Sequence, residues 1–405
     1  MTNAPLDFSQ DFPWLKKYPV HIPWDSPMEP CTLPTLLDNT CLRVPQNNCM
    51  DFLGKKYTYA MVQVLSNKIA QGLQTLGVKK GDRVGLFMPN CPYFVLFYFG
   101  VLKAGGIVVN YNPLYLEHDI KEQIKDSGTR IMVTLDLTTL YDKLHSFLPT
   151  PLEKIIVCPL GDALPFLKKL FFKIFQGKKR VNLTYSSKII SFNKLIQNKG
   201  NYKDPLLQLD DVALFQYTGG TTGTPKAAML THGNVSINAH QAYVWLQSAG
   251  HDTHKVLAAL PLFHVFAMTA VMNVTIKMGA EMIMMFPRFC VKEALHLIHK
   301  HKIDFFPAVP SIYNKINCDK NTSRYNLKSL RVCLSGGAPL PFDIKHQFES
   351  LTGCTLIEAY GLSETCPAVT SNPLTGPYKK DSIGIPFPQT IVTIRSLTDP
   401  SQTMP

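Results

Sequence analysis

The sequence has little that would mark a metal module, a secreted protein or a membrane-spanning protein. Its ten cysteines include no CxxC pair and no grouping with histidine at zinc-ligand spacing, and such scattered thiols favour a reducing compartment. The N-terminus lacks the basic-then-apolar order of a signal peptide. No apolar run is long enough to span a membrane: Phe94–Leu102 stops at Lys103, and Val265–Phe286 is interrupted by polar residues. These absences predict a cytoplasmic globular protein.

Charged residues make up only 17% of the 405 residues, whereas hydrophobic residues make up 45%. A chain of this length and composition can bury a large core in two or three packed units. Lys and Arg number 41 against 29 Asp and Glu, so the net charge is +12. This excess suits an anionic partner such as a nucleotide, a lipid headgroup or a nucleic acid. Because the chain has neither aromatic residues interleaved with basic ones nor a helix-turn-helix pattern, we do not expect nucleic-acid binding. The oligomeric state stays open, with a homodimer as one option.

Strand-like and helix-like segments alternate along the chain. Short apolar runs recur between helical patterns, which predicts an α/β fold with mainly parallel sheets flanked by helices. We expect two α/β subdomains, 1–210 and 211–380, and the start of a β subdomain at 381–405. The expected strands are Gly81–Met88, Gly106–Asn112, Arg130–Leu135, Val212–Tyr217, Lys255–Leu260, Met282–Phe286, Asp304–Pro307, Ser329–Leu334 and Thr355–Tyr360, and the expected helices are Tyr59–Leu76, Tyr93–Leu102, Glu117–Ser127, Val291–His301 and Pro341–Leu351.

The stretch YTGGTTGTPKAAMLTH, from Tyr217 to His232, begins at the end of one expected strand. Its glycines let backbone N–H groups point at one spot, its threonine hydroxyls add donors, and Lys226 adds a positive charge. Together they predict a cradle for a polyphosphate, followed by a returning strand. It is not a Walker loop, which needs Gly-Lys-Ser/Thr, because Lys226 stands between Pro225 and Ala227. The residues expected to hold phosphate are Thr218, Gly219, Gly220, Thr221, Thr222, Gly223, Thr224 and Lys226.

The stretch EAYGLSET, Glu358–Thr365, combines a ring, a glycine, a hydroxyl and a carboxylate. Tyr360 can stack on a base, and Gly361 permits a turn. Ser363 can donate a hydrogen bond to a phosphate oxygen, and Glu364 offers a hard oxygen ligand for Mg²⁺. The alternative is a capped helix start with Ser363 as the N-cap. The order of these groups favours a nucleotide and metal site.

Two further stretches carry weaker signals. In LPLFHVFAM, His264 stands in an apolar run, which favours a histidine that caps or hydrogen-bonds at a strand end. In LSGGAPL, two glycines and a proline follow a strand, so that a flat aromatic ring could lie close to the backbone. The alternative for that stretch is an ordinary strand-to-helix turn. Its four central residues are Gly336, Gly337, Ala338 and Pro339.

The loop YTGGTTGTPKAAMLTH resembles the signature of the adenylate-forming, or AMP-binding, superfamily of acyl-CoA synthetases, luciferases and adenylation domains. In that family the loop holds the β- and γ-phosphates of ATP. The resemblance implies that His264 lies beside the acyl site and that the turn from Gly336 to Pro339 lines the adenine pocket. It implies catalytic roles for Lys226, His264 and Glu364, with Glu364 also holding Mg²⁺.

Four stretches narrow the resemblance: KKGDRVGLFMPN, GVLKAGGIVVNYNPLY, ALPLFHVFAM and SNPLTGPYKKDSIGIPFP are similar to bacterial long-chain fatty-acid–CoA ligases. The likeness runs from about Trp14 to about Arg395. It implies that a fatty acid reacts with MgATP to give acyl-AMP, and that coenzyme A then displaces AMP. Two alternatives stay open: a ligase for a medium-chain or aryl acid, and a non-catalytic module that holds nucleotide or acyl-AMP.

The resemblance also implies groups that lie outside this sequence. Family members continue past the position of Pro405 and use an Asp and an Arg for the ribose, and a Lys on a small C-terminal lid domain. We therefore expect a fragment without that domain, which binds ATP weakly and turns over slowly or not at all.

A basic segment, Leu164–Arg180, interrupts the α/β alternation. At 100° per residue its first three lysines fall on one side of a helix, and most of its apolar residues fall on the other, with Phe172 as the exception. Such a helix can lie in a headgroup layer at the inner face of the membrane. The alternative is a helix whose apolar side packs on the protein's own core and whose lysines are solvated.

Overall fold

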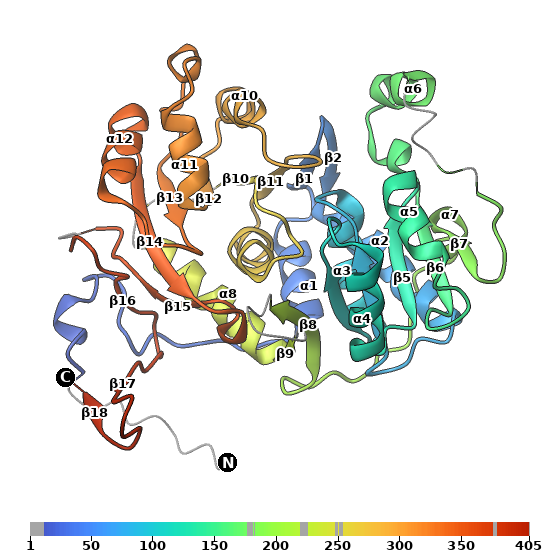
Figure 1. Ribbon diagram of the computed structural model, residues 1–405, viewed down its shortest axis with the longest axis horizontal. Helices are drawn as coiled ribbons and strands as arrows, with labels where there is room; N and C mark the ends of the chain where they lie inside the picture. Colours follow the sequence, from blue (N-terminus) through green and yellow to red (C-terminus); the bar gives the residue numbers. More distant parts are fainter. Residues whose placement is uncertain are drawn as a thin grey trace.

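Two large sheets stand side by side in the molecule, as Figure 1 shows. Their strands are mainly parallel and helices flank them, which confirms the predicted α/β class. A computed structural model describes most of the chain, namely residues 12–175 (of 173–175 the backbone alone), 181, 183–218, 226–247, 250, 254–375 and 379–404.

The first large sheet has nine strands in the order β16-β15-β14-β13-β12-β10-β11-β1-β2. The run from β14 to β1 is parallel, whereas β15 and β16 at one edge and β2 at the other are antiparallel to their neighbours. The strands are β1 (Asn48–Phe52), β2 (Lys55–Thr58), β10 (Lys255–Ala258), β11 (Glu281–Met284), β12 (Phe305–Ala308), β13 (Val332–Ser335), β14 (Thr355–Gly361), β15 (Ala368–Ser371) and β16 (Ile385–Pro386).

The second large sheet has seven strands in the order β7-β6-β5-β3-β4-β8-β9, all parallel except for the final β8–β9 hairpin. Strands β4 and β5 are buried along their whole length, as expected for a sheet covered on both faces. The strands are β3 (Arg83–Phe87), β4 (Ile107–Tyr111), β5 (Ile131–Leu135), β6 (Lys154–Cys158), β7 (Ile189–Ser191), β8 (Val212–Thr218) and β9 (Lys226–Thr231).

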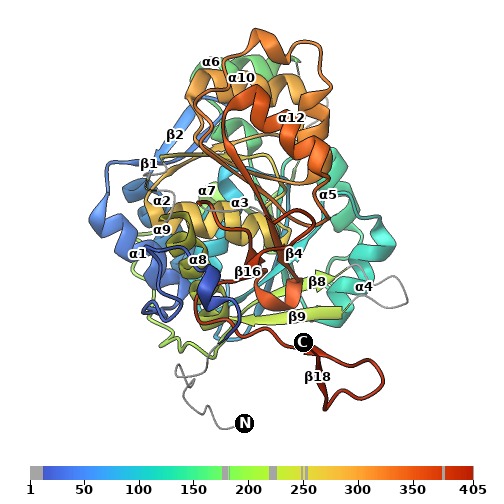
Figure 2. The same cartoon turned by 90° about the vertical axis from the view of Figure 1, so that its left-hand side faces the viewer.

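A group of helices packs together between the sheets and contacts both of them (Figures 1 and 2). Every residue of α3 is buried, as the apolar run predicted. Thr58 caps α2, because its hydroxyl accepts a hydrogen bond from the Met61 amide at 3.2 Å. The group comprises α1 (Leu33–Arg43), α2 (Tyr59–Thr75), α3 (Pro92–Lys103), α8 (His232–Gln247), the π-helix η4 (Ala267–Asn273) and α9 (Val274–Met278).

The remaining helices lie on the outside of the sheets. Two of them, α4 and α10, have the predicted bounds, and α4 ends at Gly128, whose φ of 63° makes the left-handed turn that closes many helices. They are α4 (Glu117–Ser127), α5 (Thr138–His145), α6 (Phe166–Phe175), α7 (Phe192–Leu195), α10 (Val291–His301), α11 (Pro310–Asn317) and α12 (Phe342–Thr352), with short 3₁₀ turns η1 (Leu15–Lys17), η2 (Leu160–Ala163), η5 (Thr322–Arg324) and η6 (Ser363–Thr365).

The two sheets exchange segments along the chain. Strands β1 and β2 come before residue 210 yet join the nine-stranded sheet, and β8 and β9 come after it yet join the seven-stranded one. The expected boundary at 210 therefore does not separate the sheets, and 1–210, 211–380 and 381–405 as folding units stay a prediction. Near the end of the chain, β17 (Ile394–Arg395) and β18 (Thr403–Met404) form a small hairpin. Across the described residues, no helix combines the length and the apolar character needed to cross a membrane.

Candidate active site

The predicted phosphate loop connects the two strands of the β8–β9 hairpin. Thr218 and Lys226 are paired across the hairpin, and the Thr218 hydroxyl lies 3.4 Å from the Lys226 carbonyl oxygen. The Lys226 side chain is exposed. The Tyr217 hydroxyl donates a hydrogen bond to the Asp126 carboxylate of α4, which ties the hairpin to a neighbouring helix. The predicted residues Gly219, Gly220, Thr221, Thr222, Gly223 and Thr224 lie outside the described residues, so their role stays a prediction.

The EAYGLSET stretch forms the end of β14 and the turn η6. The Thr365 hydroxyl donates to the Pro367 carbonyl at 2.6 Å and accepts from the Leu362 amide at 2.9 Å, so the turn is closed by its own hydrogen bonds. Gly361 is required here, since a Cβ atom would collide with the Pro367 carbonyl. Tyr360 is 42% exposed, which leaves its ring free to stack on a base.

Both strands of the hairpin pack against η6. Two motifs that are more than a hundred residues apart in sequence therefore lie together, and Figure 1 shows the two segments next to each other. Ser363 is half-buried and Glu364 is exposed on this turn. The hairpin and the turn that bears Glu364 are thus neighbours in the fold.

The Glu364 carboxylate is suited to a magnesium ion held jointly with a nucleotide. Among the described residues, no three His, Cys, Asp or Glu side chains cluster in a way that could hold a metal by themselves. Mg²⁺ commonly takes one or two protein carboxylates and fills its other positions with phosphate oxygens and water. A single exposed carboxylate on a turn that packs against the β8–β9 hairpin fits that pattern.

The LSGGAPL stretch is the turn that follows β13. The Gly336 amide donates to the Ala308 carbonyl at 3.2 Å, and a Cβ on Gly336 would lie only 3.1 Å from the Phe266 ring. Gly337 has a φ of 79°, which an L side chain rarely adopts. The next two residues, Ala338 and Pro339, are exposed. The turn offers a bare stretch of backbone at the same end of the sheet as Tyr360, because β13 and β14 are parallel neighbours.

Glu358 connects the turn after β13 to the EAYGLSET stretch, and the sequence does not mark it for this role. Its buried carboxylate accepts a hydrogen bond from the Leu340 amide at 3.1 Å, which ties the 336–340 turn to β14 two residues before Tyr360. Burial raises the pKa of Glu358 above its ordinary value, although the Leu340 amide partly opposes this. Glu358 is therefore a positioning residue for the turn.

His264 caps the helical segment that includes η4, not a strand end as predicted, because β10 already ends at Ala258. Its Nδ1 atom accepts a hydrogen bond from the Phe266 amide at 3.3 Å, and its carbonyl accepts one from the Met268 amide at 2.9 Å. The side chain reaches the surface, and partial desolvation lowers the pKa of His264 below the ordinary value for histidine. A neutral imidazole is thus favoured next to Phe266, which in turn touches the Gly336 turn.

A buried amide network connects the hairpin to the His264 segment. The Asn110 side chain donates to the Gln216 side-chain oxygen at 3.1 Å, and Gln216 donates to the Phe263 carbonyl at 3.2 Å. The Gln123 side chain donates to the Asn110 carbonyl at 2.9 Å. The only sequence signal for this network is the polar residue inside each apolar strand, IVVNY and VALFQYT. All predicted site residues in the described part of the chain thus gather around the carboxyl ends of β8, β13 and β14, the usual position of ligand sites in α/β sheets.

A family model described as AMP-binding enzyme matches residues 37–402. The chain belongs to this family. This AMP-binding family member is 39% identical over 389 residues to the long-chain-fatty-acid–CoA ligase of Bacillus subtilis (strain 168). The aligned region covers 95% of this chain and 69% of that relative.

Solved structures show that the AMP-binding fold is shared. An anthranilate CoA ligase in complex with anthranoyl-AMP superposes with a TM-score of 0.80 at 22% identity, covering 94% of this chain and 68% of that one. A long-chain-fatty-acid-CoA ligase from Archaeoglobus fulgidus superposes with a TM-score of 0.77 at 23% identity, covering 96% of this chain and 75% of that one. At these identities the likeness establishes the fold and not the substrate.

Proposed function

We propose that this AMP-binding enzyme is an ATP-dependent ligase that converts a long-chain fatty acid to acyl-AMP and then to acyl-CoA. The observation that carries the proposal is the packing of the β8–β9 hairpin, which bears the predicted phosphate loop, against η6, which bears Glu364. The name of the Bacillus subtilis relative supports the substrate class. We also propose that the enzyme acts in the cytoplasm or at the inner face of the membrane.

In the first step the fatty carboxylate attacks the α-phosphorus of ATP, and pyrophosphate leaves. The hairpin loop and Lys226 hold the leaving pyrophosphate, while Tyr360 stacks on the adenine that lies along the 336–339 turn. Glu364 would hold a Mg²⁺ ion, which would supply charge neutralisation on the phosphates, and Ser363 donates to a phosphate oxygen. In the second step the thiol of coenzyme A attacks the acyl carbon, and AMP leaves. Positioning and charge stabilisation supply the acceleration, so no covalent enzyme intermediate is needed.

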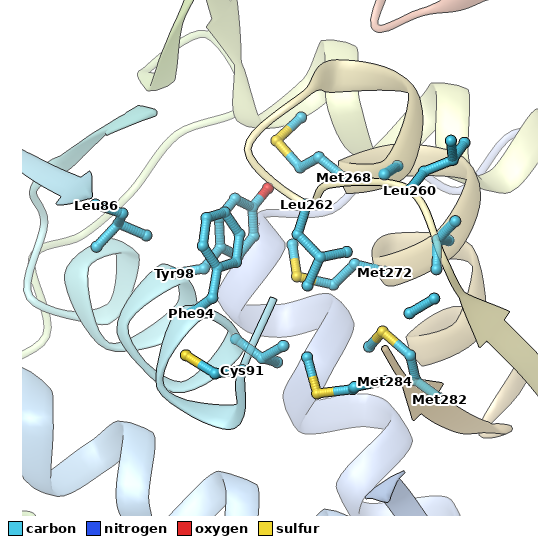
Figure 3. Packing of buried hydrophobic residues seen from close by; sticks show 14 of the residues in the cluster. Leu86, Cys91, Phe94, Tyr98, Leu260, Leu262, Met268, Met272, Met282 and Met284 are labelled. Carbon is cyan, nitrogen blue, oxygen red and sulfur yellow. The ribbon is translucent and has the colours of Figure 1, made fainter. Parts of the chain in front are cut away.

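The surroundings of His264 support an apolar acid. The segment after His264 enters η4, all of whose residues are buried. Figure 3 shows methionines of η4 and β11 gathered in the core beside α3. Methionine is unbranched and adaptable, so these side chains can move aside for an acyl chain more easily than branched ones. The methionines labelled there are Met268, Met272, Met282 and Met284.

Fatty-acid-dependent exchange of pyrophosphate into ATP tests the first step, with saturated acids of increasing length and an aryl acid as substrates. We expect Lys226→Ala and Glu364→Gln to lower the exchange rate by roughly a hundredfold, in the range found for single charge-stabilising groups. The matched controls Lys199→Ala and Asp210→Asn remove exposed charges away from the site and should leave the rate unchanged.

Three outcomes separate the candidate functions. Preference for long chains supports the proposal, and preference for medium-chain or aryl acids replaces its substrate class. If no acid supports exchange while equilibrium binding of MgATP still depends on Lys226 and Glu364, this chain acts as a nucleotide-binding module, and the proposed ligase chemistry does not take place on it.

A further inference from the structure

Helix α6 presents four of its described apolar side chains to solvent. Phe166 and Leu167 are 80% and 77% exposed, and Phe171 and Leu170 are 63% and 50% exposed. In both views the helix lies at the outer rim of the molecule, at the upper right of Figure 1 and at the top of Figure 2. Single exposed apolar residues are common, but four on one helix form a patch of the kind that marks an interaction surface.

The lysines of α6 hold the helix in this orientation. The Lys168 ammonium donates to the Leu53 carbonyl of the β1–β2 turn at 2.8 Å, and the Lys169 ammonium lies 2.7 Å from the Asp162 carboxylate. The Asp162 carbonyl also accepts a hydrogen bond from Lys55 at 2.5 Å. Burial alone would raise the pKa of Asp162, but hydrogen bonds from Lys169 and Asn193 outweigh it and lower that pKa, so the carboxylate stays charged.

Phe172 helps to fix the same orientation through an apolar contact. It is the one large apolar residue on the lysine side of the described helix, and it packs against the protein core. Beside it is a shallow hollow of about 410 Å³, lined by Leu53, Leu164, Leu167, Lys168, Phe171 and Phe172. In the described residues the apolar side is therefore not covered by the core, whereas Lys168 and Lys169 are exposed as the alternative expected. The body of the protein binds the polar side of α6 and leaves the apolar side outward.

The charge around this patch selects its partner. The segment Leu164–Arg180 contains five lysines and one arginine and no Asp or Glu. Lys168 donates to the neutral Leu53 carbonyl and also lies within electrostatic reach of the Glu293 carboxylate on α10, so the excess positive charge of the segment comes from its other cations. Apolar residues surrounded by cations match a bilayer with anionic headgroups, since the side chains enter the acyl boundary while the cations stay at headgroup level.

We propose that α6 is a docking helix for an anionic phospholipid bilayer, and that it lies flat in the headgroup layer with Phe166, Leu167, Leu170 and Phe171 inserted. The surface is separate from the nucleotide site. It acts without ATP or fatty acid, and its failure would leave the proposed ligase chemistry untouched.

Flotation with vesicles tests the proposal on the whole chain. We expect binding to vesicles that contain phosphatidylglycerol, weaker binding to pure phosphatidylcholine, and loss of the difference as salt is raised. Leu167→Ser/Leu170→Ser should weaken binding about tenfold or more, because two leucines no longer leave water. The matched control is Leu114→Ser/Leu116→Ser, which alters leucines that are 82% and 69% exposed on another face. Thermal unfolding checks that both variants are folded.

Either of two results overturns the proposal. The first is equal loss of vesicle binding in both double variants, or no binding by the parent chain. The second is a parent chain whose self-association, measured by sedimentation, is abolished by Leu167→Ser/Leu170→Ser while vesicle binding is unaffected; the occupant of the patch would then be a second copy of the chain.

Discussion

Helices α3 and α6 have similar apolar content and opposite surroundings. All twelve residues of α3 are buried, including Lys103, whose ammonium lies 2.6 Å from Asp38 and 2.7 Å from the Asn67 side-chain oxygen. On α6 Lys168 and Lys169 are bonded to the protein, and Phe166, Leu167, Leu170 and Phe171 are exposed. The partners available beneath each helix, and not its hydrophobicity, decide which side the protein covers. An amphipathic pattern identifies two faces but does not say which one the fold will bury.

The largest expected difference between the helices concerns their lysines. Asp38→Ala would leave the fully buried Lys103 ammonium without a counter-charge, which typically costs about 3–5 kcal/mol of unfolding free energy. Urea denaturation measures the loss. Adding Lys103→Met should recover much of it, because the buried charge is then gone. If Asp38→Ala costs less than about 1 kcal/mol, Lys103 finds solvent in the variant and α3 is not the rigid core helix described here.

The pH dependence of stability gives a second contrast between the buried core and α6. His232 begins α8, its Nδ1 accepts a hydrogen bond from the Leu33 amide at 3.2 Å, and burial lowers the pKa of His232 to about 4. In this window the unfolded chain, with an ordinary pKa of 6.5, binds the proton and the folded chain does not. Stability should therefore fall by about 3 kcal/mol as the pH decreases from 6.5 to 4.

Denaturation of parent and His232→Gln at several pH values isolates this contribution. The variant is expected to be less stable at neutral pH but to lose less stability on acidification. The two curves would run parallel if His232 titrated normally in the folded protein. The pair between Asp162 of η2 and Lys169 of α6 is unaffected over this range, because the pKa of Asp162 is lowered from 3.8.

Packing gives a third, smaller contrast. A Cβ on Gly100 of α3 would lie 2.7 Å from the Ile69 Cβ on α2, closer than side-chain atoms can approach. We expect Gly100→Ala to cost about 1–3 kcal/mol through overpacking, despite the better helix propensity of alanine. On α6, Leu170→Ala should change stability by no more than about 0.5 kcal/mol. Equal costs in thermal unfolding would mean that α6 is as closely packed as α3.

Much of the fold could be predicted because local patterns were strong. The apolar run of α3, and the bounds of α4 and α10, follow from periodicity and helix-ending residues. The assignment of β1 to the nine-stranded sheet could not be predicted, since its pairing with β11 joins segments more than two hundred residues apart. Nor does any local pattern mark η4 as a π-helix.

Some residues of the candidate site could likewise be predicted from the sequence and others could not. Tyr360, Gly361 and Glu364 were identified because their residue types and order suit a nucleotide. Glu358 and Gln216 were missed, since a polar residue in a strand carries no sign of which distant backbone group it will hold. Sequence thus reveals groups that face a ligand more readily than groups that hold those elements in place.

The smallest expected effect on stability comes from the ion pair between Lys169 of α6 and Asp162. Lys169 and Asp162 are 51% and 34% exposed, so solvent screens their attraction, and Lys169→Gln should lower the unfolding free energy by about 0.5 kcal/mol or less. The local effect should be larger than the global one, because the pair holds one turn of a peripheral helix. Hydrogen exchange of the α6 amides should therefore accelerate severalfold while exchange in α3 stays unchanged. A global loss above about 2 kcal/mol would instead show that α6 unfolds together with the body, and the contrast with α3 would no longer hold.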